Sequence, residues 1–158
     1  MKIIQATPEM PGMTEVEVRK FLESKLNMRL GTVDERGDPN IHPVWFYFDN
    51  KNNNNAKLHA LTGNPSKKLS EIRRNPNVYF CIDDENFPPK GVKGKGVATI
   101  SEDVSANISM MEKIYTKYLG TLEHPLAKMR LENVKKGNTI ILDITPKFFS
   151  TWDLSKAR

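Results

Sequence analysis

The spacing of hydrophobic and polar positions along the chain predicts a few amphipathic helices. Apolar side chains that recur every three to four residues mark one face of a helix. In the first such stretch, Thr14 and Glu17 have the spacing of a capping box, in which each side chain satisfies a backbone N–H of the other. The predicted helices are residues 14–26, Ser66–Arg74, Val104–Leu119 and, with a less regular pattern, Pro125–Asn133.

Most of the remaining chain has the composition of short strands, rich in β-branched and aromatic residues. Pro43 interrupts one of these runs, and since proline cannot donate a ladder hydrogen bond, it predicts an edge, a bulge or a break facing a ligand. The run Asn77–Ile82 is almost continuously apolar, which predicts a strand buried on both faces. The predicted strands are Leu30–Asp34, Asn40–Asp49, Lys57–Thr62, Asn77–Ile82, Val92–Ser101, Asn138–Ile144 and Lys147–Asp153, with a polar loop at Asn50–Asn55 and a hinge at Thr145-Pro146.

These elements predict a mainly β fold with flanking helices. Six or more short strands that do not alternate regularly with helices favour a closed or nearly closed antiparallel barrel over a parallel α/β sheet. The 158 residues contain no internal repeat and no linker, so we expect a single domain over residues 1–158.

Composition narrows the class of protein. A single cysteine, Cys81, excludes a disulfide framework and a cysteine-based zinc cage within one chain. The three histidines have no i, i+4 pairing, so we expect no metal site. No apolar run approaches a membrane span, and the first residues lack the pattern of a signal peptide, so we expect a cytoplasmic protein without a membrane partner. The net charge of +5 is spread without a dense basic stripe, so we do not expect nucleic-acid binding.

The chemistry-bearing pattern with the clearest physical basis is the start of the second predicted helix. Lys67 and Lys68 lie in its first turn, where the partial positive charge of the helix disfavours cations. A bound phosphate would resolve this conflict, because the helix N–H groups, the hydroxyls of Thr62 and Ser66 and both ammonium groups could all face it. The alternative is a short helix carrying two solvated lysines.

Two aromatic features could contact a flat ligand. The run His42-Pro43-Val44-Trp45-Phe46-Tyr47 could form the wall of a ring-binding site or simply a core strand of a barrel. Trp152 could either close the packing near the C-terminus or contact the ligand. No paired carboxylates and no nucleophile–base motif stand out, so we assign no catalytic residue.

The ordered set of segments resembles the pyridoxamine 5'-phosphate oxidase-like, FMN-binding split-barrel superfamily. The resemblance extends over residues 14–153 and is nearer to the small flavin- and deazaflavin-dependent reductases than to the oxidase itself. It is carried by five segments: residues 31–39, 43–46, 62–68, 72–78 and 92–98.

The resemblance implies a six-stranded antiparallel split β-barrel of Greek-key type and a homodimer with FMN in two symmetric grooves at the subunit interface. His42 through Tyr47 would line the isoalloxazine edge, and Gly91 and Val92 would meet the flavin from the partner subunit. Leu61, Thr62, Ser66, Lys67 and Lys68 would surround the ribityl phosphate, and Trp152 would pack near the ring.

The resemblance also implies a function, a flavin-dependent oxidoreductase acting on a small-molecule redox substrate. The oxidase pattern has arginine where His42 stands and lysine where Tyr47 stands, and its C-terminal Arg-x-His motif is absent, so we do not expect oxidation of pyridoxamine phosphate. Two alternatives stay open: a deazaflavin coenzyme in place of FMN, and a non-catalytic flavin- or haem-binding protein of the same shape.

Overall fold

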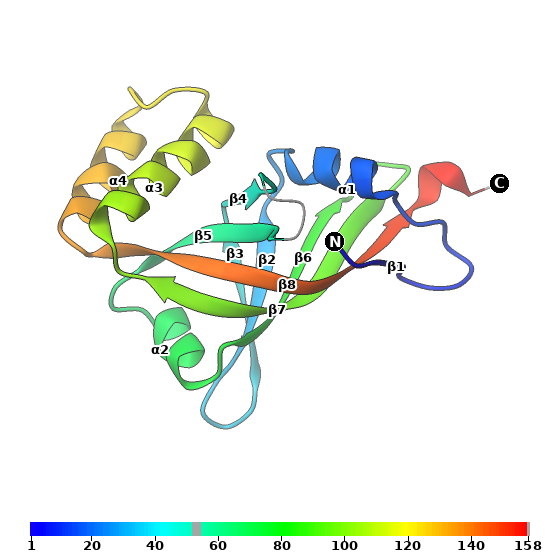
Figure 1. Ribbon diagram of the computed structural model, residues 1–158, viewed down its shortest axis with the longest axis horizontal. Coiled ribbons are helices and arrows are strands. Elements are labelled where there is room, and N and C mark those ends of the chain that lie inside the picture. The colour runs from blue at the N-terminus through cyan, green and yellow to red at the C-terminus, as the bar shows by residue number, and fades with distance from the viewer. Residues whose placement is uncertain (52–54, 158) are drawn as a thin grey trace.

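Strands that curl into a half-barrel make up most of the structure, a computed structural model that describes residues 1–51 and 55–157 (Figure 1). The predicted loop at Asn50–Asn55 falls partly outside the described residues. The strands are β1 (Ile3–Gln5), β2 (Met28–Val33), β3 (Pro39–Val44), β4 (Phe46–Asp49), β5 (Lys57–Gly63), β6 (Asn77–Asp84), β7 (Lys90–Ser101) and β8 (Thr139–Asp153). The helices are α1 (Glu15–Leu22), α2 (Lys67–Arg74), α3 (Val104–Leu119), α4 (Pro125–Lys135) and the 3-10 turn η1 (Leu154–Lys156).

The order of the strands explains how the sheet curls. The strands lie in the order β3-β2-β6-β7-β8-β5-β4, and β1 pairs in parallel with β8. The two end strands, β3 and β4, are consecutive in the chain and are joined by a single residue, Trp45. The end of β3 must therefore lie beside the start of β4, although the two strands form opposite edges of the sheet. The sheet curls round so that these two edges approach each other at Trp45. This confirms the split barrel predicted from the sequence, with eight strands among the described residues rather than six.

Three strand predictions need correction. The run Asn40–Asp49 forms two strands, because the chain leaves the first sheet edge and enters the other at Trp45. The predicted hinge at Thr145-Pro146 lies within one 15-residue strand, β8, and the proline is accommodated by a register shift against Lys95 and Gly96 of β7. The strand β6 is buried on one face only, since Tyr79 is 57% exposed between the buried Val78 and Phe80.

Local signals set the helix starts as predicted, but two helix ends differ. The helix predicted over residues 14–26 ends at Leu22, where the Glu23 N–H closes its last turn, and α4 continues past residue 133 to Lys135. Thr14 caps α1 in a capping box with Glu17, and Ser66 caps α2 by accepting a hydrogen bond from the Leu69 N–H at 3.1 Å. The predicted α3 has the bounds Val104–Leu119. The ambiguous segment contains α4, whose first residue, Pro125, has the fixed φ that suits a helix start.

Two hydrophobic cores position the site. The larger core fills the barrel around Phe46, Phe80 and Phe149. The smaller core holds the α3–α4 pair against the sheet and includes Met111, Ile114 and Ile141. Figure 1 shows these two helices at one end of the sheet and α1 at the other, with β8 running between them. None of the helices in the described residues is long and apolar enough to cross a membrane.

Candidate functional site

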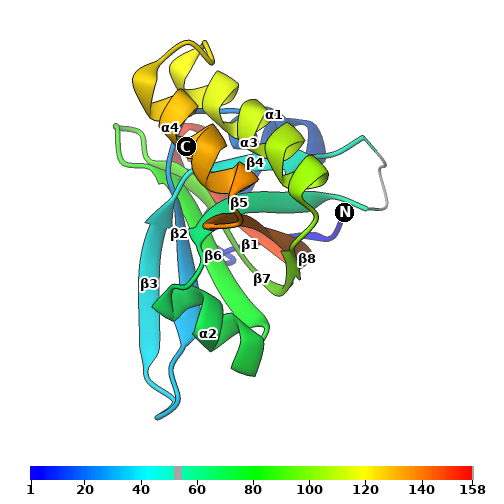
Figure 2. The same cartoon turned by 90° about the vertical axis from the view of Figure 1, so that its left-hand side faces the viewer.

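A groove with a volume of about 390 Å³ lies where α3 and α4 meet the sheet. Figure 2 looks at this side, with α3 and α4 above β5 and with α2 below it. Its lining comes from the β3–β4 junction, the end of β5, the first turn of α2, and α3 and α4. The lining residues are Pro43, Val44, Trp45, Leu61, Thr62, Gly63, Lys68, Tyr115, Leu126 and Arg130.

The loop between β5 and α2 fixes where the helix points. The backbone N–H of Asn64 donates to the Asn138 carbonyl at 2.9 Å, and the Asn64 side chain donates to the Gly137 carbonyl at 3.1 Å. Gly137 has a φ of +74°, a turn conformation that glycine adopts without a steric penalty. These bonds tie the start of α2 to the turn between α4 and β8, so that both helices border the same groove.

The two adjacent lysines of α2 take different directions. Lys68 lines the groove, and burial lowers the pKa of its ammonium group. No carboxylate of the described residues lies within 4.0 Å of it. Lys67 has a side chain that is 70% exposed, and its ammonium lies 3.8 Å from the Glu71 carboxylate, one helical turn away. The groove therefore receives one of the two predicted cations.

Arg130 supplies a second cation, which sequence analysis did not single out. Its Nε donates to the Tyr115 hydroxyl at 3.1 Å and its Nη1 donates to the Thr139 hydroxyl at 3.2 Å, so neutral partners hold it at the groove. Thr62 and Ser66 lie nearby with their hydroxyl oxygens 3.1 Å apart. Two cations and the Thr62 hydroxyl thus line the groove, with the Ser66 hydroxyl next to that of Thr62, a donor set that suits a phosphate.

Aromatic packing shapes another part of the groove wall. Trp45 stacks on Tyr118, with ring centroids 4.6 Å apart and planes 3° apart, and it meets the edge of Tyr115 at 5.2 Å. Trp45 is only partly buried, so part of its surface stays in the groove. Together with Pro43 and Leu61 it forms an apolar wall of the kind that holds a planar ring.

The structure separates the other residues of the run 42–47 from this wall. Phe46 lies fully buried in the larger core, beneath the ammonium of Lys117. Tyr47 faces α3, with the Lys113 ammonium 5.6 Å from its ring. His42 turns toward Glu71, whose carboxylate is 3.6 Å from its Nε2. Of the six residues, Pro43, Val44 and Trp45 line the groove.

Gly91, Val92 and Trp152 lie at the far end of the sheet. Gly91 pairs with Trp152 near the end of β8, whereas Thr139, beside the groove, begins the same strand (Figure 1). At about 3.3 Å per residue, β8 runs for up to roughly 45 Å between its two ends. Val92 is fully buried in the larger core. Within one chain these three residues do not approach the groove.

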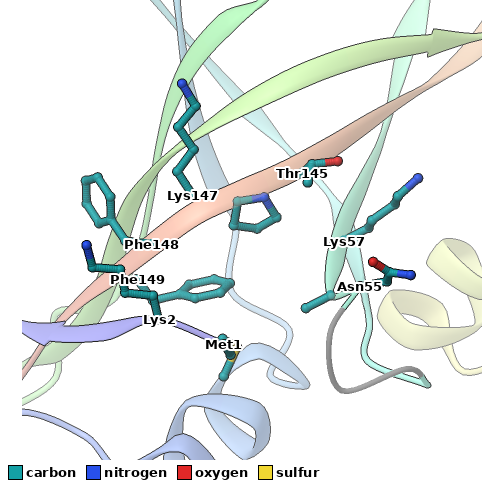
Figure 3. A pocket seen from close by; sticks show the side chains of 10 residues that line it. Met1, Lys2, Asn55, Lys57, Thr145, Lys147, Phe148 and Phe149 are labelled. Atoms are coloured by element: carbon teal, nitrogen blue, oxygen red, sulfur yellow. The ribbon is translucent and has the colours of Figure 1, made fainter.

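Other parts of the molecule offer less for catalysis. A hollow of about 100 Å³ lies near Met1 and Phe149. The side chains of Lys57 and Lys147 point away from these two residues (Figure 3). Burial raises the pKa of the Cys81 thiol, which disfavours the reactive thiolate. Within residues 1–51 and 55–157, no three His, Cys, Asp or Glu side chains are grouped so that they could hold a metal ion.

The sequence profile of the pyridoxamine 5'-phosphate oxidase family matches residues 14–153. The chain belongs to this family. The match covers every element that borders the groove, including α4 with Arg130. No functionally curated protein is significantly similar to the sequence.

Several solved structures share the fold. A conserved hypothetical protein, Rv2991 from Mycobacterium tuberculosis, aligns with a TM-score of 0.77 at 22% identity, over 94% of this chain and 89% of that one. An F420 reductase aligns with a TM-score of 0.66 at 25% identity, over 84% of this chain and 94% of that one. An FAD-binding protein from Mesorhizobium loti aligns with a TM-score of 0.63 at 18% identity, over 90% and 96% of the two chains. The split barrel is therefore shared by proteins that differ in their named ligands.

Proposed function

We propose that the groove binds a phosphorylated flavin, FMN, and that the protein is a flavin-dependent oxidoreductase acting on a small-molecule substrate. The observation that carries this proposal is that two cations, Lys68 and Arg130, line the same groove. Neither of them forms a salt bridge with a carboxylate of the described residues. Two cations without anionic partners repel each other and favour an anion between them. Membership of the family and the similarity to an F420 reductase support a redox cofactor.

The residues present fit the two ends of such a cofactor. Lys68 and Arg130 would hold the phosphate together with the hydroxyls of Thr62 and Ser66. The stacked pair of Trp45 and Tyr118 fixes the wall against which the ring would lie. A bound flavin supplies hydride and electron transfer from its own ring, so the protein needs to position the ring and exclude water. This agrees with the absence of an evident acid–base pair among the groove-lining residues.

Haem is a weaker candidate for this groove. Haem iron is usually held by His, Cys, Met or Tyr. The lining contains no His, Cys or Met, and the hydroxyl of its Tyr115 already accepts a hydrogen bond from Arg130. The donor set favours a ligand with an anionic tail over a metal macrocycle.

The neighbouring lysines provide a matched test of the phosphate position. Lys68→Met should weaken FMN binding by about 1–3 kcal/mol, the range for losing a charged hydrogen bond. Lys67→Met changes the adjacent residue but not the groove, and its effect should stay within about 0.5 kcal/mol. Fluorescence titration of both variants with FMN and with riboflavin, which has no phosphate, measures this difference. Equal FMN affinities for the two variants, or an equal loss with riboflavin, would contradict the proposal.

A deazaflavin coenzyme is the second candidate, because F420 is a deazaflavin and an F420 reductase shares the fold at 25% identity. The same cations would serve its phosphate. Equilibrium dialysis of the purified protein against each cofactor separates the two candidates. A flavin carrier would bind FMN as tightly, but its reduced flavin would not pass electrons to any small acceptor faster than free FMNH2 does.

We also propose that the protein is a homodimer. Ile41 and Tyr79 flank Gly31 across β3, β2 and β6, and they are 68% and 57% exposed. Two large side chains on either side of a glycine form an exposed hydrophobic patch on the outer face of the sheet. A second copy seated there would cover this patch. In such a dimer, Gly91 and Trp152 of one chain would approach the groove of the other.

A further inference from the structure

A second pocket lies at the opposite end of the sheet from the groove, between α1 and the adjoining ends of β6, β7 and β8. Figure 1 shows α1 over this end and the α3–α4 pair at the other. The pocket has a volume of about 570 Å³, which falls in the range of small-molecule sites. Its apolar part consists of Met13, Phe21 and Leu26. It shares no lining residue with the groove.

Strand register places the charged lining on one face of the sheet. Asp84 pairs with Lys90, and Lys90 pairs with Asp153, so the three side chains lie side by side across β6, β7 and β8. Successive residues of a strand point to opposite faces, so Gly91 and Trp152 belong to the other face. The pocket is therefore separate from the segment that the family resemblance assigns to the flavin.

Each carboxylate of the pocket accepts hydrogen bonds from within the chain, through Oδ1 alone in Asp84 and Asp153. Glu17 accepts hydrogen bonds from the Lys156 ammonium at 2.6 Å and the Thr14 N–H at 2.7 Å. Asp84 accepts two from Asn86, at 2.7 and 3.0 Å, and Asp153 accepts two from Ser155, at 2.6 and 3.0 Å. The bond from Lys156 lowers the pKa of Glu17 to about 2, so this carboxylate stays ionised and engaged.

The lysines of the pocket are not engaged in the same way. In the part of the chain that the structure describes, no carboxylate lies within 4.0 Å of Lys20, Lys25 or Lys90. The Lys90 ammonium lies 6.0 Å from the centre of the Phe21 ring, so a cation borders the apolar surface directly. Ser24 also lines the pocket, and its buried hydroxyl has no hydrogen-bond partner among the described residues. The lysine ammonium groups and the Ser24 hydroxyl can therefore donate hydrogen bonds to a ligand in this pocket.

We propose that this pocket binds a small organic anion with an apolar body, such as an arylalkyl carboxylate or an aryl phosphate. The anionic head would lie between Lys25 and Lys90, and the body would pack against Phe21 and Met13. Lysines that have no salt bridge among the described residues and that border an apolar surface favour this ligand over a neutral molecule of the same shape. The inference is independent of the flavin proposed for the groove.

The test uses ligand-observed NMR titration of the full chain with 3-phenylpropionate and phenyl phosphate as the two anionic probes. We expect one saturable site for at least one of them, and the better binder identifies the head group. The neutral 3-phenylpropionamide should bind at least about tenfold more weakly, because it keeps the apolar body but has no charge. Weak binding of both anions, or equal binding of the amide, would overturn the proposal.

Three lysine variants locate the probe. Lys25→Met and Lys90→Met keep most of the apolar stem and remove the charge, and each should raise the dissociation constant up to about fivefold. Lys113→Met, on α3 outside this pocket, is the matched control and should leave it unchanged. Loss of binding in Lys68→Met but not in Lys25→Met or Lys90→Met would place the anion in the groove, and this too would overturn the proposal.

Discussion

The imidazole of His42 and the carboxylate of Glu71 lie 3.6 Å apart and share the hydroxyl of Thr32 as a partner. Thr32 donates to Glu71 at 2.6 Å, so its oxygen is left to accept from the His42 Nε2 at 2.8 Å. Glu71 is on α2 and the other two residues are on β3 and β2. This network therefore holds the helix that carries Lys68 against the sheet.

Glu71→Gln should destabilise the fold by about 1–3 kcal/mol, because a buried group would lose its charged hydrogen bonds. The Glu71 side chain is 2% exposed and also accepts from the Asn40 amide at 3.2 Å. A glutamine has one acceptor oxygen and would turn an NH2 group toward one of these donors. Urea unfolding followed by circular dichroism measures the change.

The control for this substitution is Glu102→Gln. Glu102 pairs with Arg73 at 2.8 Å, but both side chains are more than half exposed. Such a surface pair contributes about 0–1 kcal/mol, so the control should unfold close to the wild type. Equal losses in the two variants would show that Glu71 does not anchor α2.

His42 should make stability depend on pH. Burial, followed by repulsion from Lys68, lowers the pKa of His42 below its ordinary value of 6.5. As the pH falls through 6.5 the unfolded chain takes up a proton that the folded chain does not yet bind, so the free energy of unfolding decreases. The decrease ends below the folded pKa, where both states are protonated.

Thermal unfolding from about pH 7.5 to about pH 5 tests this dependence. His42→Gln keeps an amide donor for Thr32 but does not titrate, so its stability should fall less over this interval. Identical slopes for the variant and the wild type would rule out His42 as the source.

The helix starts could be predicted, and the family could be recognised, because both depend on short segments of the sequence. The Ser66 hydroxyl caps α2 by accepting from the N–H of Leu69, three positions along the chain, so this contact is local in the sequence. The directions of Lys67 and Lys68 could not be predicted, because adjacent helical residues point about 100° apart and only the docked helix decides which one meets the groove. Arg130 carries no local signal at all, since its position depends on the packing of α4 against α3 and β8.

The exposure of Tyr79 illustrates the same limit for strands. An apolar run predicts burial on both faces when layers cover both sides of the sheet. Here no helix of the described residues covers the face around Gly31 and Tyr79. Exposed and buried residues therefore alternate along β6, although most of its residues are apolar. Only the positions of α1 to α4, which depend on the whole chain, reveal this.

Gly91→Ala should destabilise the protein by about 1–3 kcal/mol, the usual cost of inserting a methyl group into a packed site. A Cβ at this position would lie 2.3 Å from the Cζ2 atom of Trp152, so the indole must move. Gly31→Ala is the matched control, because the nearest atom to its Cβ is the Tyr79 carbonyl oxygen at 3.5 Å. Urea unfolding followed by tryptophan fluorescence should separate the two variants, and a similar loss in both would mean that Trp152 does not pack on Gly91.

The proposed homodimer makes a prediction about the patch at Ile41 and Tyr79. Tyr79→Lys places a charge on this exposed apolar surface, and two copies facing each other there would bring like charges together in a desolvated interface. Size-exclusion chromatography with light scattering should show a dimer for the wild type and a shift toward monomer for this variant. Phe87→Lys is the control, since Phe87 is 91% exposed in the loop between β6 and β7, away from the patch. A monomeric wild type would refute the dimer. Dissociation caused by Phe87→Lys but not by Tyr79→Lys would show that the interface includes that loop and not the patch on β2, β3 and β6.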